Sequence, residues 1–285
     1  MNKIRKLVIP VAGRGTRFLP ITKAVPKEML PIIDIPTINL QVNEALEAGI
    51  EEIIFVINDK KDSIIKYFNN DTELEEFLIK NNKKELINKI KDISKNIKIS
   101  YVKQEEALGS GDAIYRAKEL IGNEAFAIMY GDDLIKGNSA LKELIEIYNK
   151  YDANVIGIGE VPKELVSSYG IISFNEDLKL VDIVEKPSIE DAPSNFAGLG
   201  RYIIKPEIFG ILENLQKGAN GEYQFTDAMK ELMNIQDFYC CKFSGTYYDI
   251  GSKLGYIKAN IAYAIDSNMK EELLSYMEKV IKENR

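Results

Sequence analysis

The segment from Val8 to Asp34, with the sequence VIPVAGRGTRFLPITKAVPKEMLPIID, constrains the fold more than any other part of the chain. The apolar run at 7–12 has the composition of a strand buried on both faces of a parallel sheet. Gly13 and Gly15 follow it and permit a sharp turn, because glycine adopts positive φ without steric cost. The segment therefore predicts a buried strand that leads directly into a loop with accessible backbone N–H groups.

The loop residues suit the binding of phosphate oxygens. Backbone N–H groups, a hydroxyl donor and a fixed positive charge predict a phosphate cradle of Ala12, Gly13, Gly15, Thr16 and Arg17. A glycine-rich turn of this spacing also occurs as an ordinary connection. Lys23 and Lys27 follow in a proline-stiffened segment unsuited to a helix or a central strand, and they favour the phosphate-binding interpretation.

Two other phosphate-binding turns fit the segment poorly. A dinucleotide-binding turn has a third glycine that opens a helix, but Arg17 occupies that place and prolines follow at 20, 26, 31 and 36. We therefore expect no helix to begin there. A P-loop ends in Gly-Lys-Ser or Gly-Lys-Thr, and no such triplet follows this loop.

The composition restricts the chemistry that remains. The 285 residues include no histidine, which excludes Ser-His-Asp and Cys-His nucleophilic schemes. Carboxylates, lysines and a metal ion must then act as in phosphoryl transfer, where positioning and charge neutralisation supply most of the catalysis. A net charge of -7 argues against nucleic acid as a partner, and no segment predicts a membrane span.

The only two cysteines, Cys240 and Cys241, are adjacent in a segment that predicts a strand. Their side chains should lie on opposite faces and form no disulfide. A reducing cytoplasm is the simplest compartment for such a chain.

Helix and strand patterns alternate along the first half of the chain. They predict strands at 52–57, 97–102 and 125–130 and helices at 38–48, 61–68 and 112–121, with a charged helical insert up to about residue 95. This alternation predicts a parallel sheet with right-handed crossovers. A more mixed second half on the same sheet is expected from strands at 154–161, 170–174, 179–185 and 198–204.

The segment at 8–34 resembles the signature of the sugar-1-phosphate nucleotidylyltransferases, and PKEMLP at 26–31 resembles their bacterial UTP:glucose-1-phosphate uridylyltransferase branch. The similarity extends over nearly the whole chain, through AGIEEIIFV at 48–56, YFNNDTELEEFL at 67–78, LGSGDAI at 108–114, GDDL at 131–134, EKP at 185–187, APSNFAGLGRYI at 192–203, GEYQFTDA at 221–228 and YDIGSKLGYIKAN at 248–260. The resemblance implies an α/β fold of the nucleotide-diphospho-sugar transferase type. Its Rossmann-like, mainly parallel central sheet is flanked by helices and followed by a C-terminal helical segment.

The resemblance also implies a function and its organisation. A cytoplasmic enzyme would use UTP, glucose 1-phosphate and Mg²⁺ to make UDP-glucose and pyrophosphate. A single nucleotidyltransferase domain at 1–285 would contain a nucleotide-binding half at about 1–135, a sugar-binding half at about 136–251 and C-terminal helices at about 252–285. A homodimer or homotetramer is implied as well.

Site residues follow from the same resemblance. Asp132 and Asp249 become the Mg²⁺ ligands, and Gly170, Glu185 and Lys186 form the sugar-phosphate site. The catalytic residues are Arg17, Lys27, Asp132 and Lys186. Without the resemblance, the aspartates at 132–133 are equally compatible with a turn, and the EKP tripeptide is more typical of a surface ion pair.

Base recognition is expected from side chains and backbone around the loop. Glu28 and Gln104, with the backbone of Ala12 and Gly109, would match the donor and two acceptors of uracil. The chain departs from the family here, because Gly111 and Asp112 stand where many uridylyltransferases have Leu-Gly-His. Arg14 likewise replaces a common leucine.

Three other functions compete with uridylyl transfer. A thymidylyltransferase acting on dTTP would share the fold but carry a different residue after the lysine of the PKE motif. A catalytically silent sugar-nucleotide sensor should lack a metal carboxylate or a phosphate lysine, and this chain retains them. A dehydrogenase lacks support because the third glycine is missing.

The last part of the chain, from Ser252, has an apolar stripe at helical spacing that includes Leu254, Ile257 and Ile261. The stripe fits packing on the chain's own core and an oligomer interface equally well. Asn268 and Glu271 have the spacing of a capping box and predict that a second helix begins there.

Overall fold

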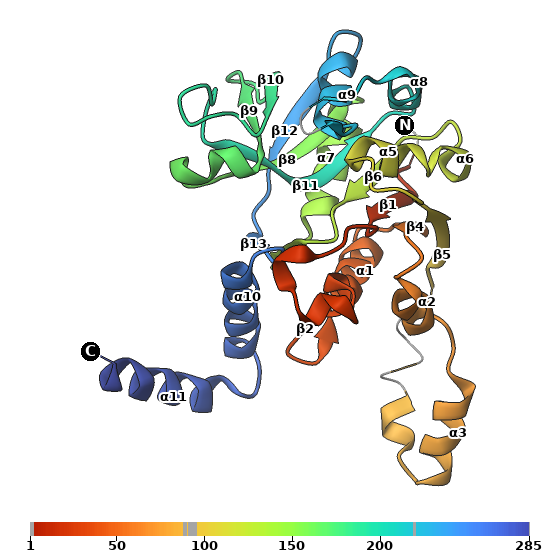
Figure 1. Cartoon of the computed structure of the whole chain (residues 1–285), viewed down its shortest axis with the longest axis vertical. Coiled ribbons are helices and arrows are strands. Elements are labelled where there is room, and N and C mark those ends of the chain that lie inside the picture. The colour runs from red at the N-terminus through yellow and green to blue at the C-terminus, as the bar shows by residue number, and fades with distance from the viewer. Residues whose placement is uncertain (1–2, 88–89, 91–95, 219–220, 285) are drawn as a thin grey trace.

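The computed structural model describes residues 3–87, 90, 96–218 and 221–284 of the chain (Figure 1). Among these residues, nine strands form one central sheet with helices on both of its faces. Seven strands follow the order β10 (Leu180–Glu185), β9 (Gly170–Phe174), β11 (Phe196–Ile204), β6 (Phe126–Met129), β1 (Lys6–Pro10), β4 (Glu52–Ile57) and β5 (Lys98–Lys103). The other two are β8 (Asn154–Glu160), which pairs with β11, and β12 (Phe238–Lys242), which pairs with β8.

The first half of the sheet is parallel, as the alternating pattern predicts. β1 pairs in parallel with β4 and β6, and β4 pairs in parallel with β5. Side chains of β1 alternate between the two faces, so Leu7 and Val8 belong to different hydrophobic cores. One core packs against α1 (Thr37–Glu47), α2 (Asp62–Phe68) and α7 (Ala140–Tyr151), and the other against α5 (Ser110–Tyr115), α6 (Lys118–Ile121), α8 (Ile208–Asn214) and α9 (Phe225–Leu232).

The second half of the sheet is mixed. β11 pairs antiparallel with β6, β8 and β9, whereas β12 runs parallel to β8. Cys240 and Cys241 of β12 are buried, unbonded to each other and assigned to opposite cores, which confirms the prediction for them.

Two short ribbons lie outside the central sheet. One consists of β2 (Pro31–Ile32) and β3 (Ile35–Pro36), and the other of β7 (Asp133–Lys136) and β13 (Thr246–Asp249). The expectation of no helix after the glycine loop was wrong for 3-10 helices, which need only one turn: η1 (Thr16–Phe18), η2 (Ile21–Lys23) and η3 (Lys27–Met29) form there.

Two predicted helices differ in the structure. The helix expected at 112–121 is divided into α5 and α6, with Arg116 and Ala117 between them. The charged insert contains α3 (Thr72–Lys80) and the 3-10 turn η4 (Lys84–Leu86), and residues 88–89 and 91–95 lie outside the described part. A further 3-10 helix, η5 (Lys163–Ser168), precedes β9.

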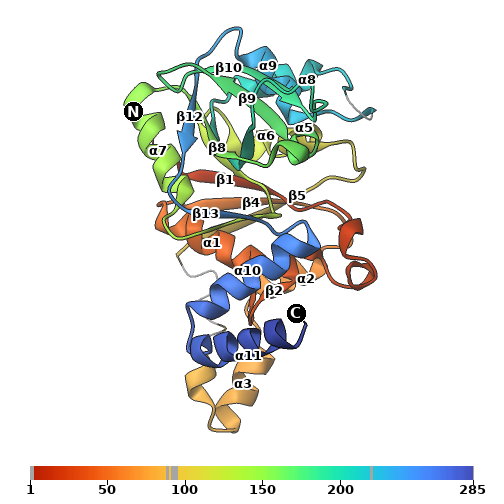
Figure 2. The same cartoon turned by 90° about the vertical axis from the view of Figure 1, so that its left-hand side faces the viewer.

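The chain ends in two helices, α10 (Lys253–Ile265) and α11 (Lys270–Glu283). α10 lies beside β13 and β2 (Figure 2), and α11 turns away from the body of the molecule, as Figure 1 shows. Leu254 and Ile257 of the apolar stripe remain exposed, so these two side chains do not pack on the chain's own core. The capping-box prediction was wrong, because α11 begins after Met269 without a side-chain cap. Across the described ranges, no helix combines the length and apolar character needed to cross a membrane.

Candidate active site

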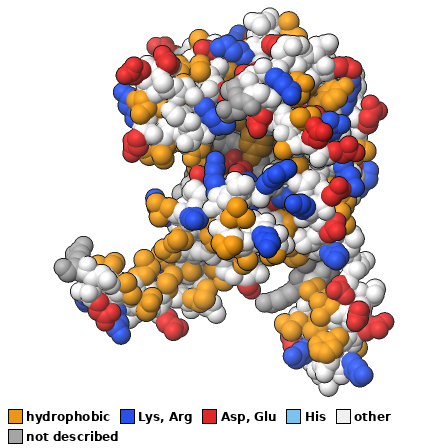
Figure 3. Space-filling view, in the orientation of Figure 1, with side chains coloured by type: hydrophobic (Ala, Val, Ile, Leu, Met, Phe, Trp, Pro, Cys, Tyr) orange, Lys and Arg blue, Asp and Glu red, His pale blue; other side chains and the backbone are white. Residues whose placement is uncertain are grey.

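A cleft of about 750 Å³ opens beside the carboxyl end of β6. Figure 3 shows it as a hollow with lysine and arginine side chains along one rim. Arg17 lines it from the glycine-loop side, and Gly170, Glu185 and Lys186 line it from β9 and β10. The cleft therefore brings together residues as far apart in the chain as Arg17 and Leu254, as the ends of adjacent strands in an α/β sheet do.

The glycine loop is held open by its neighbours. Gly15 has a φ of +64°, and a Cβ there would lie 3.1 Å from Thr22 Cγ2 and 3.3 Å from Lys27 Cβ. Asn58 donates its Nδ2–H to Ala12 O at 2.5 Å, which fixes the start of the loop to the turn after β4. Gly13 has no atom within 4 Å of an added Cβ, so its backbone faces open space. Thr16 begins η1, immediately before Arg17.

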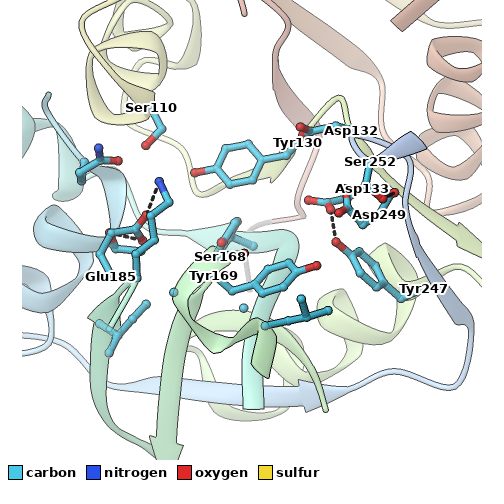
Figure 4. Close-up of a pocket in the computed structure, with 18 of the residues that line it drawn as sticks. Ser110, Tyr130, Asp132, Asp133, Ser168, Tyr169, Glu185, Tyr247, Asp249 and Ser252 are labelled. Atoms are coloured by element: carbon cyan, nitrogen blue, oxygen red, sulfur yellow. Dashed lines mark hydrogen bonds and ion pairs between the residues drawn. The ribbon is translucent and has the colours of Figure 1, made fainter. Parts of the chain in front are cut away.

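The two carboxylates predicted as metal ligands, Asp132 and Asp249, lie close together at the loop between β6 and β7. A Cβ added to Gly251 would lie 2.9 Å from Asp132 Oδ2 and 3.1 Å from Asp249 Oδ1, so these oxygens are at most about 6 Å apart, the sum of the two distances. Asp249 reaches this place from the end of β13 in the separate ribbon, not from the central sheet. Figure 4 shows Asp132, Asp133 and Asp249 grouped at one end of the cleft.

Lys27 neutralises one of these carboxylates. Its Nζ lies 2.6 Å from Asp132 Oδ2. Burial alone would lower the pKa of Lys27, but the charges of Asp132 and Glu28 raise it overall. Burial likewise opposes ionisation of Asp132, but Lys27 lowers its pKa. No lysine or arginine of the described part forms an ion pair with Asp249, and burial together with the charge of Asp132 raises its pKa although the charge of Arg17 opposes this.

Asp133 is a third carboxylate in the cleft, for which the sequence predicts no separate role. It accepts a hydrogen bond from the hydroxyl of Tyr247 at 2.6 Å. Burial and the neighbouring charge of Asp132 raise its pKa to about 7. Gly200, with a φ of +62°, lies against it so closely that a Cβ there would be 1.9 Å from Asp133 Oδ2. The doubled aspartate in the sequence was the available signal for a carboxylate pair.

Buried polar groups fix the backbone on both sides of Asp132. Gln41 donates its Nε2–H to Tyr130 O at 2.9 Å and to Asp133 O at 3.1 Å. Arg201 donates to the same Asp133 carbonyl at 3.1 Å and is paired with Glu44 at 2.8 Å. These partners satisfy carbonyl groups that would otherwise be buried at a cost.

The sugar-side residues meet at the opposite end of the cleft. Glu185 accepts a hydrogen bond from Thr226 Oγ1 at 3.0 Å and lies 3.2 Å from Lys186 Nζ. A Cβ on Gly170 would be 3.3 Å from Glu185 Oε2, so a larger residue there would crowd the carboxylate. The pair predicted as either a site or a surface contact thus lines the cleft (Figure 4).

Residues expected to recognise the base lie outside the main cleft. Glu28 is 1% exposed and paired with Lys61, because its 3-10 turn directs the side chain into the protein. Gln104 donates its Nε2–H to Gly109 O at 3.1 Å and to Asp112 Oδ2 at 2.8 Å. The unusual Asp112 is therefore tied to Gln104. Gly109 has a φ of +111°, and a Cβ there would be 2.5 Å from Tyr223 O.

The donor set suits a hard divalent cation. Within the described ranges no group of three or more histidine, cysteine or acidic side chains is arranged to hold a metal on its own. Two carboxylates supply part of an octahedral oxygen shell, and phosphate oxygens and water complete such shells in nucleotide sites. Lys27 beside Asp132 indicates that this position attracts positive charge.

Comparison with known proteins agrees with this architecture. Residues 6–265 match the family described as nucleotidyl transferase. The chain therefore belongs to the nucleotidyl transferase family, a class consistent with its glycine loop and carboxylate pair.

Individual relatives show which nucleotidyl transferases the chain is similar to. The chain is 45% identical over 286 residues to UTP–glucose-1-phosphate uridylyltransferase 2 of Staphylococcus saprophyticus, covering 98% of this chain and 99% of that protein. It is similar to a structure described as a UTP-bound UGPase from Acinetobacter baumannii, with a TM-score of 0.89, 38% identity and coverage of 96% and 98%. A UDP-glucose pyrophosphorylase complexed with UDP-glucose gives a TM-score of 0.83 at 42% identity, with coverage of 93% and 100%.

Proposed function

We propose that the chain transfers the uridylyl group of UTP to glucose 1-phosphate and releases pyrophosphate, giving UDP-glucose. The observation that carries the proposal is one cleft with two chemically different ends. Asp132 and Asp249, with Lys27 bound to Asp132, lie at one end, and Glu185 with Lys186 lies at the other. Relatives named for this reaction support the choice of substrates, and they favour it over thymidylyl transfer.

The reaction proceeds by direct displacement. A phosphate oxygen of glucose 1-phosphate forms a bond to the α-phosphorus of UTP, and the bond from that phosphorus to the bridging oxygen of pyrophosphate breaks. The attacking oxygen is already ionised near neutral pH, so no general base is needed. Cys240 and Cys241 are unsuited to covalent catalysis, because burial raises the pKa of each thiol to about 12.

The glycine loop and two cations bind the nucleotide phosphates. The backbone of Ala12, Gly13 and Gly15 and the hydroxyl of Thr16 provide donors. Arg17 and Lys27 balance charge on the α-phosphate and on the leaving pyrophosphate, and the raised pKa of Lys27 keeps it protonated.

The other end of the cleft binds the sugar phosphate. Glu185 accepts hydrogen bonds from sugar hydroxyls, Lys186 pairs with the phosphate, and Gly170 leaves room for the ring. Gln104 and the backbone of Gly109 contribute to base recognition.

Asp132 and Asp249 would hold Mg²⁺, because their oxygens are hard donors about 6 Å apart or closer. When bound, this cation supplies charge neutralisation for the phosphates. The remaining ligands are expected from phosphate oxygens and water.

Several further properties belong to the same proposal. The chain acts as one nucleotidyltransferase domain with a nucleotide-binding half, a sugar-binding half and C-terminal helices. It works in the reducing cytoplasm, in keeping with two free cysteines. The exposed Leu254 and Ile257 support a homodimer or homotetramer.

A pyrophosphate-release assay with UTP, dTTP, CTP and GTP against several sugar phosphates tests the proposal. We expect UTP with glucose 1-phosphate to give the highest kcat/KM, and CTP to be poorer by roughly a hundredfold or more, since mispaired buried groups cost about 1–3 kcal/mol each. Comparable values for CTP and UTP, or no product with any pair, would exclude it.

A further inference from the structure

A buried ion pair lies directly behind Lys27. Glu28 and Lys61 are 1% and 3% exposed, and Lys61 Nζ lies 2.7 Å from Glu28 Oε2. Such a pair contributes little net stability, because the desolvation of both charges offsets their attraction. Glu28 Oε1 is in addition buried without a hydrogen-bond partner among the described residues, which adds to the desolvation cost of this carboxylate. A cost of this kind points to a role other than stabilisation.

Glu28 is adjacent to both residues of the Lys27–Asp132 pair: it follows Lys27 in the chain, and its side chain lies against Gly131, the residue before Asp132. It follows Lys27 in η3, and its own carbonyl accepts a hydrogen bond from Thr37 Oγ1 at 2.8 Å. Its side chain also packs against Gly131, where an added Cβ would be 3.2 Å from Glu28 Cγ. Glu28 is thus placed to set the separation between the turn that carries Lys27 and the loop that carries Asp132.

Lys61 connects this arrangement to the glycine loop. It ends the turn after β4, where its N–H donates to Asn58 O at 3.1 Å. The side chain of Asn58 in turn holds Ala12 O at 2.5 Å. A single turn at 58–61 therefore holds the start of the phosphate loop and, through Glu28, the turn that carries Lys27.

We propose that the Glu28–Lys61 ion pair is a positioning device that holds the Lys27 ammonium beside Asp132. This role rests on the proposed function of Lys27 at the nucleotide phosphates. In this role Glu28 and Lys61 act on catalysis through the orientation of Lys27. The need to hold the Lys27 ammonium in one position then explains why these two charged side chains are buried.

Lys61→Met tests this role against Lys98→Met, a matched variant that breaks the exposed Lys98–Glu52 pair of 2.9 Å. Initial rates of pyrophosphate release should show a kcat about tenfold lower for Lys61→Met, with an unchanged KM for glucose 1-phosphate. Lys98→Met should retain the wild-type kcat. An unchanged kcat in Lys61→Met would overturn the proposal.

A double-mutant cycle separates positioning from general damage. In a Lys27→Met background, Lys61→Met should cause no further loss of kcat, because no ammonium remains to be positioned. Losses that multiply would show that Lys61 acts independently of Lys27 and would overturn the proposal.

Lys61→Met leaves Glu28 without its partner and could prevent folding, so Glu28→Gln/Lys61→Met serves as the second variant. It removes both charges at nearly constant volume, and its melting temperature should recover to near that of the wild type. We expect kcat to remain low despite this recovery. If kcat recovers together with the melting temperature, the pair is merely structural.

A crystal structure of the double variant gives a readout that does not depend on activity. The Lys27 Nζ to Asp132 Oδ2 distance, 2.6 Å in the wild type, should increase beyond about 3.2 Å. An unchanged distance refutes the positioning role even if the chain makes UDP-glucose. Wild-type protein without UDP-glucose activity would instead exclude the proposed function and leave this geometric result to be judged separately.

Discussion

Asp132→Asn and Asp249→Asn should lower catalysis together but change stability in opposite directions. Asp249 lies within about 6 Å of Asp132 and has no cation bound to it in the described structure, so its charge is repelled. Asp132 holds the buried ammonium of Lys27 at 2.6 Å, so its charge is needed for folding. The two variants therefore distinguish a repelled carboxylate from a neutralised one.

The magnitudes follow from these distances. Two like charges about 6 Å apart repel by roughly 3 kcal/mol at an effective dielectric constant of about 20, and solvent together with the charge of Arg17 reduces this to about 1 kcal/mol. Asp249→Asn should then raise the melting temperature by about 2 °C. Asp132→Asn leaves Lys27 unpaired at a cost of about 1–3 kcal/mol and should lower the melting temperature by about 2–6 °C.

Catalysis should fall by about 10²-fold or more in both variants, because each loses a charge that would hold the proposed cation. The rates come from pyrophosphate release at saturating UTP and Mg²⁺, and the melting temperatures from fluorimetry with EDTA present. Asp237→Asn is the control, since it neutralises an exposed aspartate paired with Lys179. Full activity in both variants, or equal destabilisation by both, would refute the reasoning.

Three further results are expected. Lys186→Ala should raise the KM for glucose 1-phosphate about tenfold with little change in kcat, and an unaltered KM in initial-rate assays would contradict its role at the sugar phosphate. Initial-rate plots for the two substrates should intersect, whereas parallel lines would indicate a covalent intermediate. The pKa of Asp133 rises from 3.8 to about 7, so the native state binds a proton that the unfolded state releases, and this carboxyl destabilises the fold as pH rises through that range. Asp133→Asn should therefore gain melting temperature relative to wild type between about pH 4 and pH 7, and a constant difference would exclude the effect.

The parallel part of the fold was predictable because its signal is local. Buried parallel strands need continuous apolar runs, and the strand predicted at 52–57 agrees with β4 residue for residue. The helix predicted at 38–48 agrees with α1 to within one residue at each end, since its apolar periodicity directly reflects the face packed on the sheet.

The ribbon that carries Asp133 and Asp249 was not predictable in this way. β7 and β13 are short and pair across more than 100 residues of sequence, so neither segment alone specifies its partner. The hydrogen bond from Tyr247 to Asp133 depends on that pairing and has no sequence signature of its own.

Glu28 illustrates a second limit. A carboxylate next to Lys27 in a polar motif favours an exposed side chain that meets a ligand. Its burial depends on Lys61, which lies 33 positions away and reaches the same interior point only in the folded chain. Local sequence reports residue type and spacing, whereas the direction of a side chain from a 3-10 turn depends on tertiary packing.

The pairing of β13 with β7, which brings Asp249 beside Asp132, has a consequence for synthesis on the ribosome. The glycine loop, Lys27 and Asp132 emerge in the first half of translation, but the second carboxylate follows more than 100 residues later. A nascent or truncated chain that ends before β13 therefore contains the phosphate loop without the complete carboxylate pair. The Asp132–Asp249 pair therefore assembles late in the synthesis and folding of each molecule, and incomplete translation products are expected to be inactive.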